Sequence, residues 1–261
     1  MCTVIVALGV WPARPLVIAA NRDENLARPA EGPRVWPAGE LATRRVLAPR
    51  DLVAGGTWIG LNDAGLAVAI TNRRAGPWRT KAPRSRGELV FAALGADDHL
   101  QAVARITAEH GEVTQYGPYH LLMADRSGAT ILWSDGRRLH RESLTPGLHW
   151  ITERSFDAAA SKRHDRLRSF EGQLLGGPLP DPGRWTSILA DHHHGALIDH
   201  PLAGLDAMCV HAPSLDYGTR SSTLIALGER REQVEFLHAD GRPCEHPLVP
   251  RPSEVSALLA P

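Results

Sequence analysis

The sequence lacks an excess of charge of either sign. Its 29 Lys and Arg residues equal its 29 Asp and Glu residues, so the formal net charge is zero. A general nucleic-acid-binding protein normally carries a marked basic excess, and the balance argues against that class. The local exception is a basic run, which comprises Arg73, Arg74, Arg79, Lys81, Arg84 and Arg86. Such a run is typical of a solvated loop, and a rim that attracts an anionic substrate is the alternative.

Cysteines and long apolar runs are also scarce. The three cysteines, Cys2, Cys209 and Cys244, show neither the spacing of metal ligands nor a disulfide framework. The first residues do not combine a charged segment with an apolar stretch and a cleavage site, and the longest apolar runs are too short to cross a bilayer. We therefore expect a cytoplasmic protein with no membrane span and no metal site.

What the chain does contain is an ordinary globular balance. Of its 261 residues, 43% are hydrophobic and 22% are charged. Single α/β domains of this length are common. Because we find no internal repeat and no clear boundary in composition, we expect residues 1–261 to form one domain.

Apolar and turn-forming residues predict the order of the elements. Two apolar runs, 3–8 and 16–20, flank a Pro-containing turn and predict two neighbouring strands that are buried on both faces. Residues 27–56 are rich in Pro, Gly and Arg and predict a long irregular excursion. Further strands are predicted at 57–61, 66–71, 119–125, 130–134, 137–142, 149–152, 207–211, 221–227 and 232–238, and helices at 89–94, 98–109, 157–175 and 184–192. This segregated order favours an α+β fold with mostly antiparallel sheets.

Cys2 is a candidate nucleophile because of its position. A small side chain after the initiator generally allows Met1 to be removed, which would leave Cys2 with a free α-amine. That amine titrates near pH ~7.7–8 and could accept the thiol proton as a general base. The alternative is a small buried hydrophobic residue, as lone cysteines usually are.

The polar tetrapeptide Asn21-Arg22-Asp23-Glu24 follows the second apolar run. Such residues can simply cap a turn. If the first two strands pair as a tight hairpin, however, the tetrapeptide lies beside Cys2. Asp23 could then accept hydrogen bonds from the α-amine, and Arg22 could hold a substrate or a neighbouring carboxylate.

These segments together resemble the NRDE family, which is named for the tetrapeptide. The resemblance rests on Met1 to Thr3, Ala20 to Glu24, Gly55 to Gly60, Asn62 to Arg73 and Tyr217 to Thr223, and it covers nearly the whole chain. The family looks like a branch of the cysteine N-terminal-nucleophile (Ntn) hydrolases, beside penicillin V acylase and choloylglycine hydrolase. The resemblance implies a four-layer αββα sandwich, in which two mostly antiparallel sheets lie between helix layers.

The resemblance also implies roles for single residues. Cys2 matches the nucleophile and Asp23 the aspartate that orients its amine, and Asn21 precedes Asp23 at the same offset. Asn72 matches an oxyanion-hole side chain at the end of a strand, and Arg220 matches an arginine near the nucleophile. As substrate-binding residues we add Arg22, Glu24, Trp58, Arg73 and Glu153.

Two positions depart from the family pattern. The acylases carry an arginine just before their Asn-x-Asp, where this chain has Ala20 and places Arg22 inside the motif instead. The NRDE pattern places Ser-Asn near residues 150–154 as a second oxyanion donor, where this chain has Glu153. A carboxylate there would repel an oxyanion, so the departure weakens the case for hydrolysis and leaves the expected fold unchanged.

The histidines at 192–194, with Asp191 before them and His200 after them, invite a metal-site interpretation. Adjacent histidines on a helix point in different directions, so a polar helix end is the preferred interpretation. Cys209, in an apolar run, is expected to be buried. The tryptophans Trp58, Trp78 and Trp150 fit either an acyl pocket or the core.

Two functions remain open. The first is an amidohydrolase that cleaves a C–N bond of a small amide or acyl compound, with Cys2 as nucleophile and no cofactor. The second is a non-catalytic protein of the same fold that binds or carries haem or a lipid, in which case Cys2 or a histidine could ligate haem. Glu153 favours the second hypothesis, and the set Cys2, Asn21, Asp23 and Arg220 favours the first. The substrate and the oligomeric state are not determined by the sequence.

Overall fold

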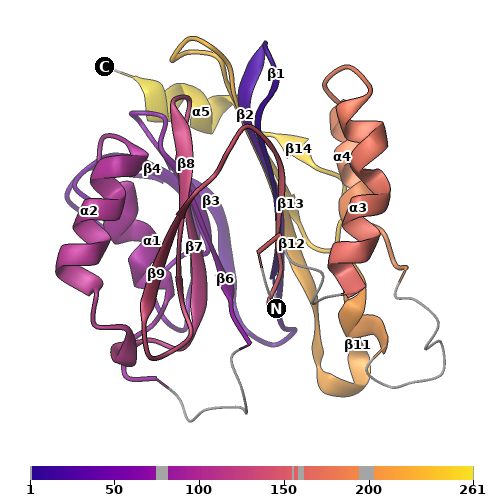
Figure 1. The fold of residues 1–261 in the computed structure, drawn as a ribbon, viewed down its shortest axis with the longest axis horizontal. Helices are drawn as coiled ribbons and strands as arrows, with labels where there is room; N and C mark the ends of the chain where they lie inside the picture. The colour runs from indigo at the N-terminus through magenta and orange to yellow at the C-terminus, as the bar shows by residue number, and fades with distance from the viewer. Residues whose placement is uncertain (1, 75–81, 155, 158–161, 194–202, 261) are drawn as a thin grey trace.

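Two antiparallel β-sheets are stacked face to face between two layers of helices (Figure 1). The computed structural model describes residues 2–74, 82–154, 156–157, 162–193 and 203–260. The first sheet has the order β10 (Gly147–Ile151), β1 (Cys2–Trp11), β2 (Arg14–Asn25), β12 (Tyr217–Leu227), β13 (Val234–Asp240) and β14 (Val249–Pro250), and β11 (His211–Ala212) also pairs with β12. The second has the order β3 (Ala30–Trp36), β4 (Val46–Asp51), β5 (Ile59–Asn62), β6 (Ala67–Asn72), β7 (Tyr119–Asp125), β8 (Gly128–Ser134) and β9 (Leu139–Ser143).

The helices complete the αββα order that the family resemblance implies. The second sheet is covered by α1 (Gly87–Leu94) and α2 (His99–His110), and the first by α3 (Lys162–Leu175) and α4 (Pro182–Leu189) (Figure 1). A last helix, α5 (Pro252–Leu259), contacts β13 of one sheet and β3 and β4 of the other. No helix in the described part of the chain is long and apolar enough to cross a membrane.

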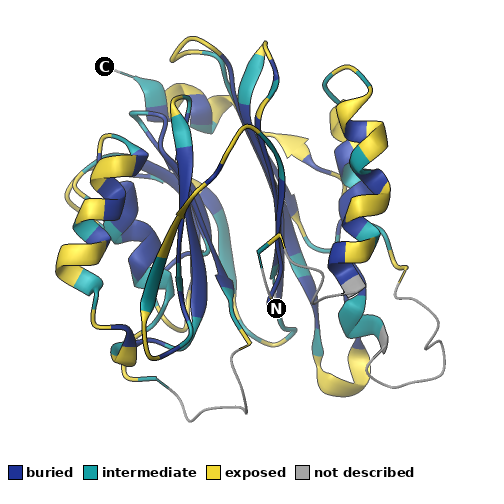
Figure 2. Ribbon diagram, in the orientation of Figure 1, coloured by how far each residue is buried: buried dark blue, intermediate teal, exposed yellow. Residues whose placement is uncertain are grey.

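Three hydrophobic cores lie between the four layers of helices and sheets. The alternation of side chains along each strand decides which core a strand residue joins. In β1, Val4 and Val6 face the other sheet, whereas Ile5 and Ala7 face α3 and α4. Because both faces are covered, β1 and β2 read as nearly continuous apolar runs, and their ribbons are mostly buried (Figure 2). This explains why their sequence shows no alternation of polar and apolar residues.

The predicted first hairpin is confirmed. β1 and β2 pair with Leu8 opposite Leu16 and Cys2 opposite Arg22. The hairpin of β5 and β6 is also confirmed, with Gly65 at φ +90° in its turn. A positive φ of this kind costs glycine little, which explains its place in the sequence signal.

Two predicted segments are wrong. Residues 27–56 contain β3 and β4 rather than an irregular excursion, because Pro33 falls at an irregularity of an edge strand, where its missing N–H is tolerated. Trp36 seals this edge, since it is fully buried and its Nε1 donates to the Ala48 carbonyl at 2.9 Å. The strand predicted over 207–211 is reduced to β11, because the Cys209 N–H donates to the Asp191 carbonyl instead of a strand ladder.

Candidate active site

Cys2 stands at the start of β1, which lies between β10 and β2 in its sheet. Its side chain is half-buried and lies directly across from Arg22 of β2. The alternation in both strands assigns Cys2 and Arg22 to the face between the sheets. On the other side, β1 pairs with β10, which ends at Ile151 opposite Val4, and Glu153 lies in the bend just beyond that end.

Asp23 faces the helix side of the same sheet and is almost completely buried. Its Oδ1 accepts a hydrogen bond from Thr219 Oγ1 at 2.7 Å, and its Oδ2 accepts one from Arg163 Nη1 at 3.0 Å. The same Nη1 donates to Thr3 Oγ1 at 2.9 Å, next to Cys2 in the chain. Burial raises the pKa of the Asp23 carboxyl, and Arg163 and Thr219 oppose that rise. The aspartate predicted to orient the α-amine is therefore held by α3 and β12.

Glu153 shares Arg163 with Asp23. Its Oε2 lies 3.9 Å from Arg163 Nη1, and its Oε1 lies 3.7 Å from Arg154 Nε. Only 4% of Glu153 is exposed, so its charge needs these neighbours. The carboxylate that departs from the family pattern thus faces a guanidinium, which offsets the repulsion it would exert on an oxyanion.

The environment of the Cys2 thiol favours its protonated form. Burial is the main factor that raises the pKa of Cys2, and the Asp23 carboxylate adds to it. The Asp23 backbone N–H and the Arg22 guanidinium act in the opposite direction. A thiol in this setting needs a base to become a nucleophile, as general-base catalysis requires.

Arg22 is fixed from the opposite sheet. Its Nη2 donates to Asp51 Oδ2 at 2.7 Å, and its guanidinium lies 4.1 Å from the ring centre of Trp58. Asp51 also accepts two hydrogen bonds from Arg28, which lies 3.9 Å from Glu24. These ion pairs join β2 to β4 at the end of the sandwich that contains Cys2.

The motif Gly55-Gly56-Thr57-Trp58 positions the ring beneath Arg22. Gly55 has φ +73°, and a Cβ at Gly56 would lie 2.5 Å from the carbonyl carbon of Gly87. Gly87 opens α1, and its carbonyl accepts a hydrogen bond from the Thr57 N–H at 3.2 Å. The two glycines therefore let the loop before β5 lie directly against the start of α1.

Asn21 is buried on the helix side of its sheet. There its Nδ2 donates to the carbonyls of Leu189 and Met208, and its Oδ1 accepts a hydrogen bond from Ser222. These bonds make it a clamp between β2, the end of α4 and the segment before β11. Its polar atoms are engaged away from the Cys2 face of the sheet.

The structure also gives the surroundings of Asn72 and Arg220. Ala67 and Ala69 of β6 face the other sheet while Val68 and Ile70 face the helices, so alternation assigns the Asn72 side chain to the helix side. Arg220 falls at the irregularity of β12 between Thr219 and Ser221 and donates to the Leu26 carbonyl. It lines a small cleft beside Arg22 and Trp58.

A cavity of about 560 Å³ lies next to this group. Two of its lining residues, Arg73 and Arg154, directly follow Asn72 and Glu153 in the chain. Arg73 stacks 4.6 Å from the ring centre of Trp133, which also lines the cavity. The remaining lining residues are His120, Glu142, Ser143, Leu144, Thr145, His149, Phe156 and Asp157.

Two arginines of the site were not predicted to belong to it. Arg163 lies in a helix, 140 positions after Asp23 in the chain, and only the tertiary fold brings them together. Arg86, expected in a solvated loop or rim, is turned inward, donates to the Pro118 carbonyl at 3.1 Å and is within electrostatic range of Cys2 and Glu24. Of the predicted acyl-pocket tryptophans, Trp150 packs in the core under α3, and Trp78 lies outside the described residues.

Solved structures with the same layer order define the class of this fold. A C2A mutant of the conjugated bile acid hydrolase from Clostridium perfringens superposes with a TM-score of 0.55 and 9% identity, over 92% of this chain and 89% of that one. A Caenorhabditis elegans N-acylethanolamine-hydrolyzing acid amidase ortholog gives 0.56 and 13%, over 89% and 96%. The protein has the fold of the Ntn hydrolases.

Sequence relatives identify the branch within that class. The chain belongs to the family described as Transport and Golgi organisation 2, whose family model matches residues 1–240. The Transport and Golgi organization protein 2 homolog of Bos taurus is 31% identical over 233 residues, which cover 80% of this chain and 81% of the relative. The Mus musculus homolog is 32% identical over 244 residues with the same coverage.

Proposed function

We propose that this protein is an Ntn amidohydrolase that cleaves the C–N bond of a small amide, with Cys2 as nucleophile once Met1 has been removed. The observation that carries the proposal is the position of Cys2 at the start of β1, directly across from Arg22 of β2, with Glu153 in the bend that follows β10 on its other side. Asp23, held by Arg163 and Thr219, supports it as the group that orients the α-amine.

The proposed reaction balances with these groups alone. The Cys2 sulfur attacks the amide carbonyl carbon while its proton passes to the α-amine, and the same proton then goes to the leaving nitrogen as the C–N bond breaks. Water hydrolyses the resulting thioester, which releases the acid and restores the thiol. The raised pKa of the buried Cys2 thiol fits this scheme, because it requires a nearby base at neutral pH.

The cavity beside the site supports a substrate with an apolar part and a polar or anionic end. Its size suits a small molecule, and Arg73 and Arg154 provide positive charge at its wall. The two structural neighbours are, by name, a conjugated bile acid hydrolase and an N-acylethanolamine-hydrolyzing amidase. Conjugated bile acids, N-acylethanolamines and N-acyl amino acids are therefore the first substrates to test.

The test compares the wild type with Cys2→Ala and Cys2→Ser. We expect intact mass to show loss of Met1, iodoacetamide to alkylate Cys2 first, and release of amine to fall by at least about 10³-fold in the alanine variant. Circular dichroism checks that each variant keeps the fold. Equal turnover by the wild type and a folded Cys2→Ala variant would overturn the proposal.

A further inference from the structure

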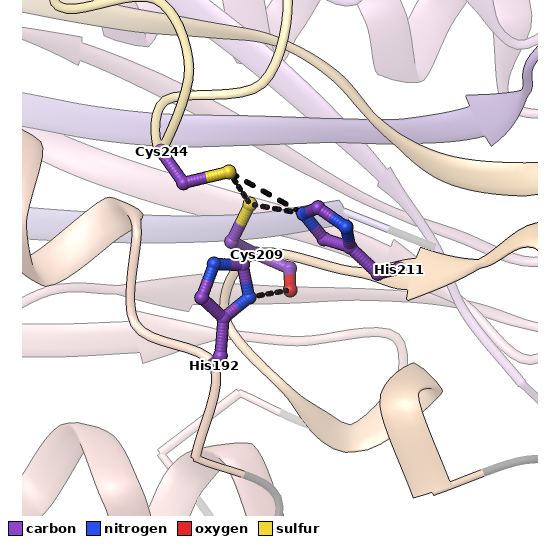
Figure 3. Close-up of side chains that lie close together, drawn as sticks. All are labelled: His192, Cys209, His211 and Cys244. Carbon is purple, nitrogen blue, oxygen red and sulfur yellow. Dashed lines mark hydrogen bonds between the residues drawn. The ribbon is translucent and has the colours of Figure 1, made fainter.

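Two histidines and two cysteines from three separate segments meet on the side of the molecule that carries α3 and α4. They are His192, which follows α4, Cys209 and His211, which flank the start of β11, and Cys244, in the loop after β13. One ligand atom from each lies within 4.8 Å of all the others (Figure 3). No local spacing in the sequence signals this Cys–His cluster, since its members are 17, 2 and 33 residues apart.

Backbone hydrogen bonds fix each segment of the cluster. The Cys209 N–H donates to the Asp191 carbonyl at 2.9 Å, which ties the end of α4 to the segment before β11. His211 is held in register opposite Gly218 of β12. The loop of Cys244 closes on the Arg242 carbonyl, which accepts hydrogen bonds from the backbone of Glu245 and His246. The four side chains therefore converge from a rigid frame.

The distances match the edges of a tetrahedron around one small metal ion. Zn–S bonds of about 2.3 Å and Zn–N bonds of about 2.0 Å set S–S edges near ~3.8 Å and S–N edges near ~3.5 Å in tetrahedral geometry. The two sulfurs are 3.6 Å apart, and His211 Nε2 lies 3.6 Å from Cys209 Sγ and 3.3 Å from Cys244 Sγ. These three groups are spaced as they would be around zinc.

The hydrogen bond of His192 selects its tautomer. Its Nδ1 lies 3.2 Å from the Cys209 carbonyl oxygen, which can only accept, so Nδ1 carries the proton and donates (Figure 3). The lone pair is then on Nε2, and a ring N–H bonded to a backbone carbonyl is the usual second contact of a histidine that binds metal. His192 is thus prepared to act as a ligand through Nε2.

We propose that the Cys–His cluster is a structural zinc site. Two sulfur and two nitrogen ligands favour zinc among the common divalent ions, and four protein ligands would close its coordination shell. Zinc would hold both cysteines as thiolates, because a coordinated thiol is deprotonated.

A zinc ion in the cluster would stabilise the segment that holds Thr219 against Asp23. Val210, between two members of the cluster, donates its N–H to Thr219 Oγ1 at 2.8 Å, and that hydroxyl donates to Asp23 Oδ1. The zinc would therefore stabilise the structure around these residues. Its binding can be measured without any catalytic activity, so failure of one proposal is distinguishable from failure of the other.

The test measures zinc in the full chain, purified under reducing conditions after expression with added zinc. We expect about one zinc per chain in the wild type and in His193→Ala, an exposed neighbour outside the cluster. We expect zinc affinity to fall more than about a hundredfold in Cys244→Ser, whose position is exposed, and in His211→Ala. Circular dichroism confirms that the variants are folded.

Cobalt provides a second measurement on the reduced apo-protein. Binding in the cluster gives the thiolate-to-cobalt charge-transfer band and the strong visible bands of tetrahedral cobalt, both absent in Cys244→Ser. Wild-type protein that takes up neither metal would overturn the proposal, as would metal uptake that Cys244→Ser and His211→Ala leave unchanged. A Cys209–Cys244 disulfide whose reduction restores no metal uptake would assign the cysteines to redox chemistry and would also overturn it.

Discussion

At the scale of single residues, one arginine organises the candidate site. Arg163 is fully buried, bonds Asp23 and Thr3 through one nitrogen, and lies 3.9 Å from Glu153. Its second nitrogen donates to the Leu205 carbonyl at 2.6 Å. Two buried carboxylates thus share this one buried cation.

Replacing Arg163 with Met should destabilise the protein by about 3–5 kcal/mol, because Asp23 and Glu153 would lose the buried cation that they share. Urea unfolding, followed by circular dichroism, measures this change. Arg168→Met is the matched control in the same helix, since that side chain is 62% exposed, and it should shift stability by no more than about 0.5 kcal/mol. Equal shifts in the two variants would show that the Arg163 pairs contribute nothing net.

The site could be predicted from the sequence only where its residues are close in the chain. Cys2 and Asp23 lie on two strands of one hairpin, so pairing two apolar runs is enough to bring them together. Arg163 lies in α3 and Arg86 directly precedes α1 in the opposite helix layer, so their approach to the site depends on how whole layers stack. Asn21 was assigned to catalysis from its offset to Asp23, but the offset does not reveal the carbonyls of Leu189 and Met208 that it binds.

At the scale of elements, close contact between two glycines joins the loop before β5 to α1. A Cβ at Gly56 would overlap the Gly87 backbone. A Cβ at Gly32 in β3 would meet nothing within 4 Å, which makes Gly32 a control. Gly56→Ala should therefore lower the free energy of unfolding by about 1–3 kcal/mol, and Gly32→Ala should be nearly neutral. Thermal unfolding of both variants measures the difference; the expectation fails if they melt together.

Both sheets carry the same cross-strand pair of threonine and histidine. Thr71 lies opposite His120 in β6 and β7, and Thr223 lies opposite His238 in β12 and β13, each with an Oγ1–Nδ1 distance of 3.2 or 3.0 Å. Burial is the main cause that lowers the pKa of His120 to about 3 and that of His238 to about 4. Both histidines are therefore neutral in the folded protein at pH 7.

These histidines should make the protein sensitive to acid. Their pKa values in the folded state lie below the unfolded value of about 6.5, so their contribution to stability is complete above pH ~6.5 and is lost as the pH falls toward 4. Urea unfolding at a series of pH values should show this loss, and a variant with His120→Asn and His238→Asn should show a shallower slope. The exposed His193→Asn should keep the wild-type slope. Identical slopes in all three proteins would assign the acid sensitivity to other groups.

Prediction of the elements succeeded where local signals decide and failed where tertiary contacts do. The hairpins of β1 with β2 and β5 with β6 follow from apolar runs and turn residues. β3 is stabilised instead by Trp36, whose ring is covered by the Arg34 guanidinium at 3.3 Å and bonded to β4. A propensity argument that counts Pro33 and the nearby glycines cannot include these contacts.

At the scale of the whole molecule, β1, β2 and β12 are enclosed on all sides. Each is paired on both sides and covered by apolar residues on both faces. We expect their amides to exchange with solvent hydrogen slowly, and those of the edge strands β3 and β14 to exchange faster. Hydrogen–deuterium exchange with mass spectrometry measures this order. Equal protection of β3 and β2 would contradict it.

Because side chains alternate between the two faces of β1, the face on which Cys2 lies depends on whether an even or odd number of residues separates it from Val4. Both side chains lie on the face between the sheets, and Thr3 between them faces Arg163. Inserting one codon here would move the thiol to the helix side, away from Arg22, although every residue of the original sequence would still be present. In the gene, an in-frame insertion of one codon at this point should therefore remove the thiol from the site as a cysteine substitution would.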